Sequence, residues 1–190
     1  MLILRPYKST DAVTIVEWCR DEETFRNWVG DRYDFFPITD ADMNNKYFDY
    51  NGDCIEVDNF YPLTAVEEDG SLVGHMIIRY LNGDNQNLRF GWMIVDNELR
   101  NQRYGREMLQ LALKYSFEIL RAEKVSAGVF DNNMTAYNCF ISAGFKDVEI
   151  NESEAYQFDG ERWNVLELEC TKEDYRAKKS RAVNGSFLKR

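Results

Sequence analysis

The segment from Ile94 to Glu107 constrains the fold most, because it joins an apolar stretch to a long helix through a polar loop. Residues 86–96 read as a buried strand, and apolar residues recur at helical spacing from 105 to 121. The first amides of a helix have no internal partners, and the helix dipole adds partial positive charge there. The junction therefore predicts an anion site built from the backbone alone.

Three arginines add full positive charge to this junction. Arg100, Arg103 and Arg106 lie within seven residues, on a chain whose 33 acidic and 23 basic residues give a net charge of −10. Gly105 would let a bulky phosphate approach the backbone closely. A solvated helix cap with scattered arginines would look the same in sequence, so this segment alone leaves both interpretations open.

The order of the other elements predicts the fold class. Antiparallel strands come first, followed by a strand–helix–strand–helix–strand run, which favours a mixed α/β or α+β sheet with helices on its faces. We expect strands at 1–7, 86–96, 124–130, 145–150 and 162–170, a hairpin over 63–81, and helices at 9–20, 22–28, 39–48, 105–121 and 133–143. At 190 residues the chain predicts a single domain over 1–170. The tail, residues 171–190, is basic and is expected to be partly helical or frayed.

Composition excludes several classes of function. A nucleic-acid binder needs a basic face, which this acidic chain does not predict. No apolar run reaches the roughly 18 residues that a membrane span needs, and the opening residues do not resemble a secretory signal. The four cysteines form no CxxC pair and His75 is the single histidine, so we expect no metal site. These features favour a cytoplasmic protein with reduced thiols, and both a monomer and a homodimer fit them.

A second motif follows the strand at 124–130. Asn133 is followed by Ala136 three residues later, Phe140 seven later and Gly144-Phe145 at eleven and twelve. With the Arg100-x-x-Arg103-x-Gly105 loop, this spacing resembles the GCN5-related N-acetyltransferase (GNAT) superfamily. Its loop reads Arg/Gln-x-x-Gly-x-Gly/Ala, and its helix Asn-x-x-Ala/Ser-x-x-x-Tyr-x-x-x-Gly-Phe. The resemblance covers about residues 1–170 and is closest to the branch of ribosomal-protein and small-amine acetyltransferases.

This resemblance implies a mostly antiparallel sheet that splays into a V-shaped cleft between the strands at 89–96 and 124–130. Acetyl-CoA would be the co-substrate, with its pantetheine arm paired as one more strand edge. The residues implied to bind it are Met93, Ile94 and Val95 for the arm, Arg100, Asn101, Gln102, Arg103, Tyr104, Gly105 and Arg106 for the pyrophosphate, and Asn133 and Phe140 beside the arm.

The implied reaction is direct acetyl transfer, in a ternary complex, to a small cationic amine or a protein N-terminus. The family's usual tyrosine acid is replaced by Phe140, whose ring donates no proton. Tyr137, one turn earlier, is the candidate general acid, and His75 is a low-ranked candidate base. Structural roles for both, and transfer through water or without a dedicated base, remain open. Cys139 is expected to be a small buried residue pointing away from the cleft.

Residues 29–61 differ in composition from the rest, with eight acidic and eight aromatic residues against two basic ones. The resemblance places the acceptor pocket here, and carboxylates with aromatics suit a cationic amine. A solvated acidic loop anchored by its aromatics is the alternative. For the whole chain, the alternative function is a non-catalytic CoA-binding or interaction domain, because Phe140 and Arg103 depart from the family at functional positions.

Overall fold

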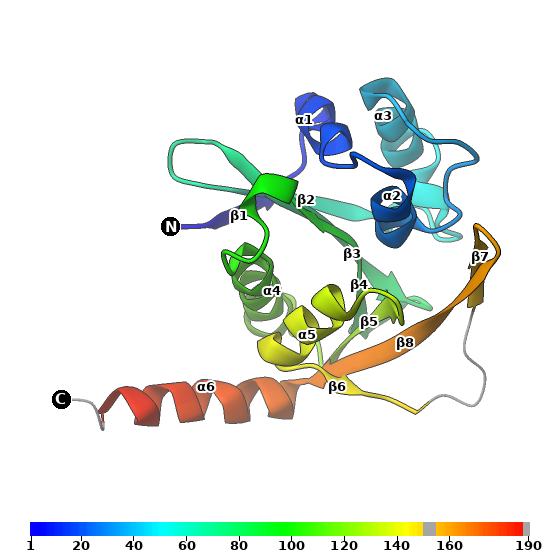
Figure 1. Cartoon of the computed structure of the whole chain (residues 1–190). Coiled ribbons are helices and arrows are strands. Elements are labelled where there is room, and N and C mark those ends of the chain that lie inside the picture. Colours follow the sequence, from blue (N-terminus) through cyan, green and yellow to red (C-terminus); the bar gives the residue numbers. More distant parts are fainter. Residues whose placement is uncertain (150–154, 188–190) are drawn as a thin grey trace.

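The computed structural model describes residues 1–149 and 155–187, and its centre is an open mixed sheet (Figure 1). The strands run in the order β1-β2-β3-β4-β5-β8-β6, with β7 paired to β8. Every pairing among the described strands is antiparallel except that of β4 with β5. The strands are β1 (Ile3–Pro6), β2 (Tyr61–Val66), β3 (Leu72–Leu81), β4 (Asp84–Val95), β5 (Lys124–Phe130), β6 (Lys146–Asp147), β7 (Ala155–Phe158) and β8 (Glu161–Thr171).

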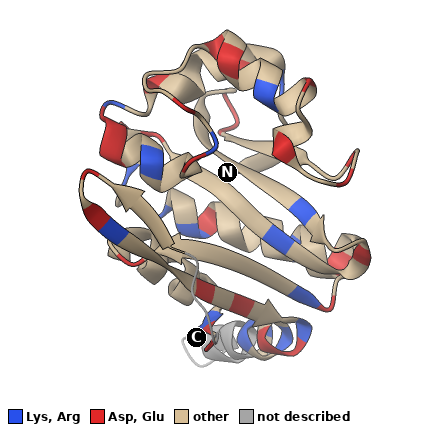
Figure 2. Cartoon of the chain, turned by 90° about the vertical axis from the view of Figure 1, so that its right-hand side faces the viewer, with Lys and Arg blue, Asp and Glu red and all other residues tan. Residues whose placement is uncertain are grey.

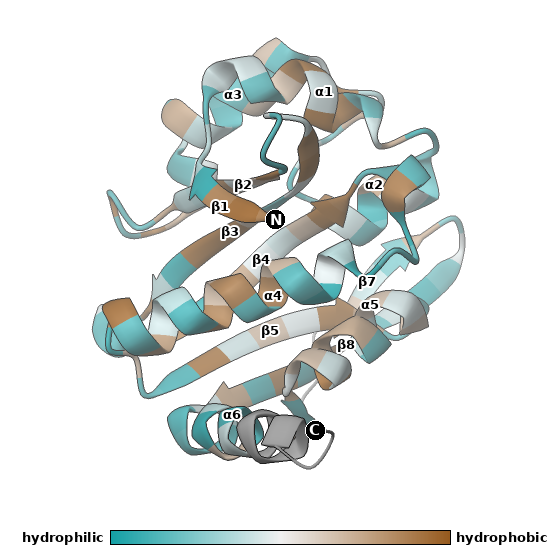
Figure 3. Ribbon diagram, turned by 90° about the vertical axis from the view of Figure 1, so that its left-hand side faces the viewer, coloured by the Kyte–Doolittle hydropathy of each residue, from teal (hydrophilic) through white to brown (hydrophobic). Residues whose placement is uncertain are grey.

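Helices cover both faces of this sheet. One face carries α1 (Ala12–Glu17), α2 (Glu22–Val29) and α3 (Asp40–Phe48), and the other carries α4 (Tyr104–Lys114) and α5 (Met134–Ala143). Figure 3 shows α4 lying across the middle of the sheet. The last helix, α6 (Lys172–Phe187), runs along the bottom of the molecule in Figure 1. Of the described helices, none has the length and apolarity that crossing a bilayer would require.

Two hydrophobic cores hold the layers together. Under α4, Met108 and Leu109 pack with Phe90 of β4 in one cluster. On the opposite face, Phe25 of α2 and Met43 of α3 belong to a second cluster that includes Ile77 and Ile94. Full burial of each such side chain contributes about 1.5–3 kcal/mol, so packing on both faces stabilises the central strands β3 and β4.

The mixed fold expected from the sequence is confirmed, and several local signals account for it. Thr39 begins α3 as predicted: its hydroxyl accepts from the Asp42 amide at 3.2 Å, and the Asp42 carboxylate accepts from the Thr39 amide at 2.8 Å. This reciprocal cap satisfies two helix-end donors. Gly144, with φ 123°, ends α5 as expected.

Other elements differ from the expectation. The helix expected to reach residue 121 ends as α4 at Lys114 and continues as a π-helical turn, Tyr115–Ile119. The strand expected at 145–150 is reduced to β6, and residue 150 lies outside the described residues. β7 was not predicted, although an Asp159-Gly160 turn with φ of 48° and 78° joins it to β8 as a hairpin. α6 is longer than the helical turn or two expected for the tail.

Candidate functional site

The sheet opens where β4 and β5 part. These strands pair only between residues 87–90 and 124–127, and beyond that point β5 pairs with β8. From Gly91 to Val95, the outer edge of β4 has no partner strand among the described residues. The β3–β4 register also shifts between His75 and Ile77, opposite Trp92, whose φ is 46°. This bulge leaves outward-pointing main-chain groups of β4 free to pair with a ligand.

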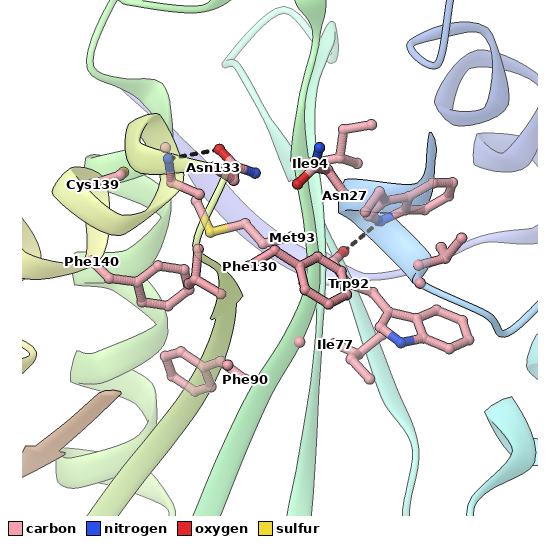
Figure 4. A pocket seen from close by; sticks show the side chains of 18 of the residues that line it. Asn27, Ile77, Phe90, Trp92, Met93, Ile94, Phe130, Asn133, Cys139 and Phe140 are labelled. Carbon is pink, nitrogen blue, oxygen red and sulfur yellow. Dashed lines mark hydrogen bonds between the residues drawn. The ribbon is translucent and has the colours of Figure 1, made fainter. Parts of the chain in front are cut away.

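A single cleft of about 1360 Å³ follows this opening. Its walls come from α2, the 52–55 loop, β3, β4, the 99–106 loop and α5. In Figure 4, Met93 and Ile94 lie between Asn133, Cys139 and Phe140 on one side and Asn27 on the other. The predicted donor-site residues that line it are Met93, Ile94, Val95, Arg100, Asn101, Arg103, Tyr104, Gly105, Arg106, Asn133 and Phe140. Gln102 is absent from this lining, and its side-chain amide donates to the Glu98 carbonyl at 3.1 Å.

The loop before α4 has the geometry of an anion site. Asn101 and Arg103 adopt positive φ values of 64° and 72°, although neither is glycine. Such angles are uncommon for non-glycine residues and cluster at functional sites. Arg103 is the N-cap of α4, and its side chain makes no cap hydrogen bond; within the part of the chain that the structure describes, no other side chain accepts one from the first amides of this helix. The first amides of α4 therefore face the cleft with the partial positive charge of the helix terminus.

Gly105 serves packing more directly than ligand access. A Cβ atom there would lie 3.1 Å from the Cys139 sulfur and 3.2 Å from the methyl of Met93. The missing side chain lets α4 approach α5 and β4 closely. Cys139 therefore lines the cleft beside Gly105, contrary to the expectation that it points away. Burial raises the pKa of its thiol, so that group stays protonated at neutral pH.

The α5 residues of the second motif have clear structural roles. The side-chain oxygen of Asn133 accepts from the Ala136 amide at 3.1 Å, which caps the helix. Phe140 is 4% exposed and packs edge-on against Phe145, with ring centroids 5.0 Å apart. Both also contribute to the cleft lining, so the helix positions them at the edge of the site.

The structure does not bring Tyr137 into this site. Its hydroxyl donates to the Asp147 carboxylate at 2.7 Å, and Tyr137 is not among the cleft-lining residues. That hydrogen bond, ahead of burial, raises the pKa of Tyr137 above its ordinary value. Because α5 turns this side chain toward β6, the position one turn before Phe140 does not supply a proton donor at the cleft.

His75 also lies away from the lining. Its ring is fully buried, and its Nε2 lies 2.8 Å from the Tyr47 hydroxyl. The rings of Tyr7 and Trp28 pack edge-on against it. Burial lowers the pKa of His75 to about 3, so the ring is neutral at physiological pH. These contacts make it a core residue between β3 and the helices rather than a base in contact with a substrate.

Residues 29–61 contain both anchoring aromatics and residues that line the cleft, so the two interpretations of this segment, an anchored loop and a pocket wall, each apply in part. Tyr33, Tyr47 and Phe60 are buried in the second core and Phe36 packs against it, so half of the eight aromatics are anchors. Other residues of the segment line the cleft: Val29, Gly30, Asp31, Arg32, Gly52, Asp53, Cys54, Ile55 and Phe60. The lining acids Asp31 and Asp53 pair with Arg32 at 3.3 Å and Lys46 at 2.5 Å, respectively. The acidic charge on this wall is therefore largely compensated.

Sequence reasoning missed three polar groups of the cleft. The side-chain Oδ1 of Asn27, on α2, is buried there without a hydrogen-bond partner among the described residues. Arg79 and Arg89, on β3 and β4, line the far end. The alternation of polar and apolar residues along these strands marks Arg79 and Arg89 as facing away from the α4 core, but nothing local marks Asn27.

Comparisons with known proteins show which family model the chain matches and which solved structures share its fold. The family model for an acetyltransferase (GNAT) domain matches residues 1–146. A spermidine N-acetyltransferase from Vibrio cholerae, solved with CoA and spermine, superposes with a TM-score of 0.75 at 20% identity, covering 92% of this chain and 97% of that one. A putative phosphinothricin N-acetyltransferase superposes with a TM-score of 0.65 at 18% identity, covering 90% and 98%. A comparison with curated protein sequences found no match.

Proposed function

This chain belongs to the GNAT acetyltransferase family, and on that premise we propose that it transfers the acetyl group of acetyl-CoA to the amine of an acceptor bound on the α2 side of the cleft. The observation that carries the proposal is the continuity of one cleft from the uncapped N-terminus of α4, along the unpaired edge of β4, to the 52–55 loop. Such a cleft has room for a long donor at one end and an acceptor at the other.

The residues on the donor side fit acetyl-CoA. Main-chain groups of Met93 to Val95 would pair with the amides of the pantetheine arm, as a strand edge does. The amides at the start of α4, with Arg100, Arg103 and Arg106 nearby, would hold the pyrophosphate. Acetyl-CoA supplies the activated acetyl group as a thioester. Asn133 and Phe140 would border the arm from α5.

The reaction needs few side chains. The acceptor nitrogen attacks the thioester carbonyl, so a C–N bond forms while the C–S bond breaks, and the proton lost from nitrogen is matched by one gained at sulfur. Tyr137 and His75 lie outside the cleft, and Phe140 has no acidic proton, so solvent carries both protons in this proposal. Holding the two reactants in line then supplies most of the acceleration.

Asn27 is the residue that we assign to the acceptor amine. Asn27 lines the cleft on the opposite side of β4 from α5 (Figure 4), and its buried Oδ1 has no hydrogen-bond partner among the described residues. A neutral amine that donates one hydrogen bond to this oxygen keeps its lone pair free for attack. A buried polar atom without a partner costs about 1–3 kcal/mol, so a donor that satisfies it is bound favourably.

The test combines calorimetric titration of CoA with a thiol-release assay, using acetyl-CoA and a panel of primary amines. We expect saturable CoA binding, and turnover of at least one amine with the acetylated product identified by mass. Asn27→Ala should raise KM for the amine while leaving KM for acetyl-CoA unchanged, and Asn45→Ala, at an exposed residue of α3 outside the cleft lining, serves as the control.

Other outcomes contradict the proposal. Tight CoA binding with no turnover of any amine would favour the non-catalytic CoA-binding domain, for which Phe140 in the family's tyrosine position is the supporting observation. Absence of saturable CoA binding would favour an interaction domain that uses the acidic surface instead.

A further inference from the structure

Two arginines face each other at the far end of the cleft. Arg79 of β3 and Arg89 of β4 are partners in the antiparallel register, and both line the cleft. Side chains directly opposite on neighbouring strands are close, so like charges there are destabilising. Such a pair persists where negative charge compensates it.

Arg89 has that compensation within the protein. Its two terminal nitrogens donate to the two carboxylate oxygens of Glu167, each at 2.7 Å. Gly128 makes room for this pair, since a Cβ atom there would lie 2.7 Å from the guanidinium. The Arg89–Glu167 pair is bidentate and complete, so Arg89 needs no further anion.

Arg79 has no such partner. It is half-buried, and no hydrogen bond or ion pair joins its guanidinium to any residue within 1–149 or 155–187. Burial lowers the pKa of Arg79, and the net shift stays downward because the positive charges of Arg89 and Arg32 oppose the raising effects of Cys54 and Glu56. Removing a cation from water without pairing it with an anion is unfavourable. An anionic group bound beside this guanidinium would therefore be stabilised by it.

The acidic side chains of residues 29–61 that line the cleft or lie near Arg79 form no ion pair with its guanidinium among the described residues. Asp31 and Asp53 pair with Arg32 and Lys46. The nearby carboxylate of Glu56 accepts from the Asn59 side chain at 2.9 Å and lies beyond ion-pair distance of Arg79. Figure 2 shows that acidic segments predominate on the upper helices, whereas the strands of the sheet carry both basic and acidic segments. Arg79 is therefore a basic group of the cleft lining that carries no ion pair among the described residues, although the carboxylate of Glu56 lies near it.

The strand register sets the spacing. Ile77 pairs with Gly91, the residue before the Trp92 bulge, and Arg79 lies two residues further along β3. At about 3.3 Å per residue, the Arg79 Cα lies roughly 7 Å along the sheet from the point where β4 opens. An acceptor whose amine reaches the bulge can therefore place a second group a few bonds away within reach of the guanidinium.

We propose that Arg79 binds an anionic oxygen group of the acceptor, so that the acceptor is a zwitterion: a primary amine that carries a carboxylate or phosphonate several bonds from its nitrogen. This inference rests on the acetyl-transfer function proposed above and names its substrate class. It replaces the purely cationic amine expected from the composition of residues 29–61. The planar fork of an arginine matches a carboxylate or phosphonate with two parallel hydrogen bonds.

The experiment measures kcat/KM for matched acceptors that differ only in the anion. The series runs from glycine to 6-aminohexanoate, each beside its n-alkylamine, with aminoalkylphosphonates as a second arm and spermidine as the cationic reference. The proteins are the wild type, Arg79→Gln, Arg79→Lys and, as a control outside the cleft, Arg121→Gln.

At one chain length we expect the wild type to prefer the anionic member by at least about 10-fold, a preference equivalent to one charged hydrogen bond. Arg79→Gln should lower kcat/KM for that acceptor by about 10- to 100-fold, leave the n-alkylamine and KM for acetyl-CoA unchanged, and be partly rescued in Arg79→Lys. The better of the carboxylate and phosphonate arms identifies the anion.

Equal losses on both members of every pair would assign Arg79 a structural role and overturn the inference. A wild type that acetylates spermidine and n-alkylamines without preferring any anionic acceptor would also overturn it, while leaving acetyl transfer intact. If no amine is acetylated, the proposed function fails, and thermal shift with 5-aminopentanoate and CoA decides: a stabilisation lost in Arg79→Gln supports the anion site, and no stabilisation refutes it.

Discussion

The two walls of the cleft differ in the segments of the chain and the chemical groups that form them. The proposed donor wall comes from two short segments, residues 93–106 and 133–140, and the contacts that we propose for it in the first segment are mainly main-chain groups. The acceptor wall consists of side chains from α2, the 52–55 loop and β3, which are distant in sequence. A main-chain site tolerates changes of side chain, as Arg103 shows by adopting φ 72° where the family has glycine. A site made of side chains changes its ligand contacts with each substitution. We therefore expect specificity for the acceptor to vary through this wall.

The largest effect should come from breaking a buried ion pair that joins β1 to the turn before α1, outside the cleft lining. Asp11 is 4% exposed and accepts two hydrogen bonds from the Arg5 guanidinium, at 2.7 and 2.9 Å, and one from Thr64 at 2.8 Å. Despite its burial, these bonds hold the pKa of Asp11 below its ordinary value. Asp11→Asn should lower the free energy of unfolding by about 3 kcal/mol, because Arg5 loses its partner.

Urea unfolding measures this change, with Glu98→Gln as the control. Glu98 forms an exposed pair with Arg20 at 2.8 Å, and such pairs contribute about 0–1 kcal/mol. If the two variants lost similar free energies of unfolding, the buried Asp11–Arg5 pair would contribute no more than the exposed Glu98–Arg20 pair, which would contradict the prediction. The folded fraction of Asp11→Asn should keep its KM for acetyl-CoA, because this ion pair lies outside the cleft lining.

A second test damages the donor wall alone. In Gly105→Leu the new side chain collides with Cys139 and Met93, which moves the start of α4 away from β4. A displacement of about 1 Å in a positioned site costs on the order of 10²-fold in rate. We expect that loss in kcat/KM for acetyl-CoA, a milder one in Gly105→Ala, and an unchanged KM for the amine in steady-state kinetics. Equal changes in both Michaelis constants would remove the distinction between the walls.

The buried histidine predicts a pH-dependent effect on the acceptor side, which is the smaller one only near neutral pH. The pKa of His75 is about 3 in the folded protein against an ordinary value of 6.5, so below that ordinary value the unfolded chain binds a proton that the folded one does not. Stability should therefore fall as pH drops from 6.5 toward 3, by up to about 1.4 kcal/mol per pH unit. His75→Gln removes this contribution, so urea unfolding at pH 7.5, 5.5 and 4.5 should show a flatter profile. If the stability of the wild type and of His75→Gln fell in parallel as the pH drops, the assignment of His75 as buried and neutral would be wrong.

The smallest effect is expected at Tyr137. Its hydroxyl is bonded to Asp147 outside the cleft, so Tyr137→Phe should leave kcat and the pH–rate profile unchanged. Phe140→Leu, which alters a ring in the cleft wall, is the matched control and should lower kcat/KM for acetyl-CoA. A reduced kcat in Tyr137→Phe would restore that hydroxyl as a proton donor.

Local signals allowed part of the fold and site to be predicted. Thr39 marked the start of α3, and Gly144 marked the end of α5, because caps depend on residues a few positions apart. The Asp159-Gly160 turn carried a similar signal for β7 that the prediction did not use. The proximity of Arg79 to Arg89 had no such signal, because a strand register joins residues that are distant along the chain.

The sequence by itself determined the class of fold and pointed to the place of the proposed donor site, because an apolar strand, a polar loop and a helix start are local features with local physics. Only the tertiary structure decided which side chains face the cleft. It turned Tyr137 toward Asp147, buried His75 against Tyr47, and left the Asn27 oxygen and the Arg79 guanidinium without partners among the described residues. Side-chain direction and burial depend on how both faces of the sheet are packed, and that packing is a property of the whole fold.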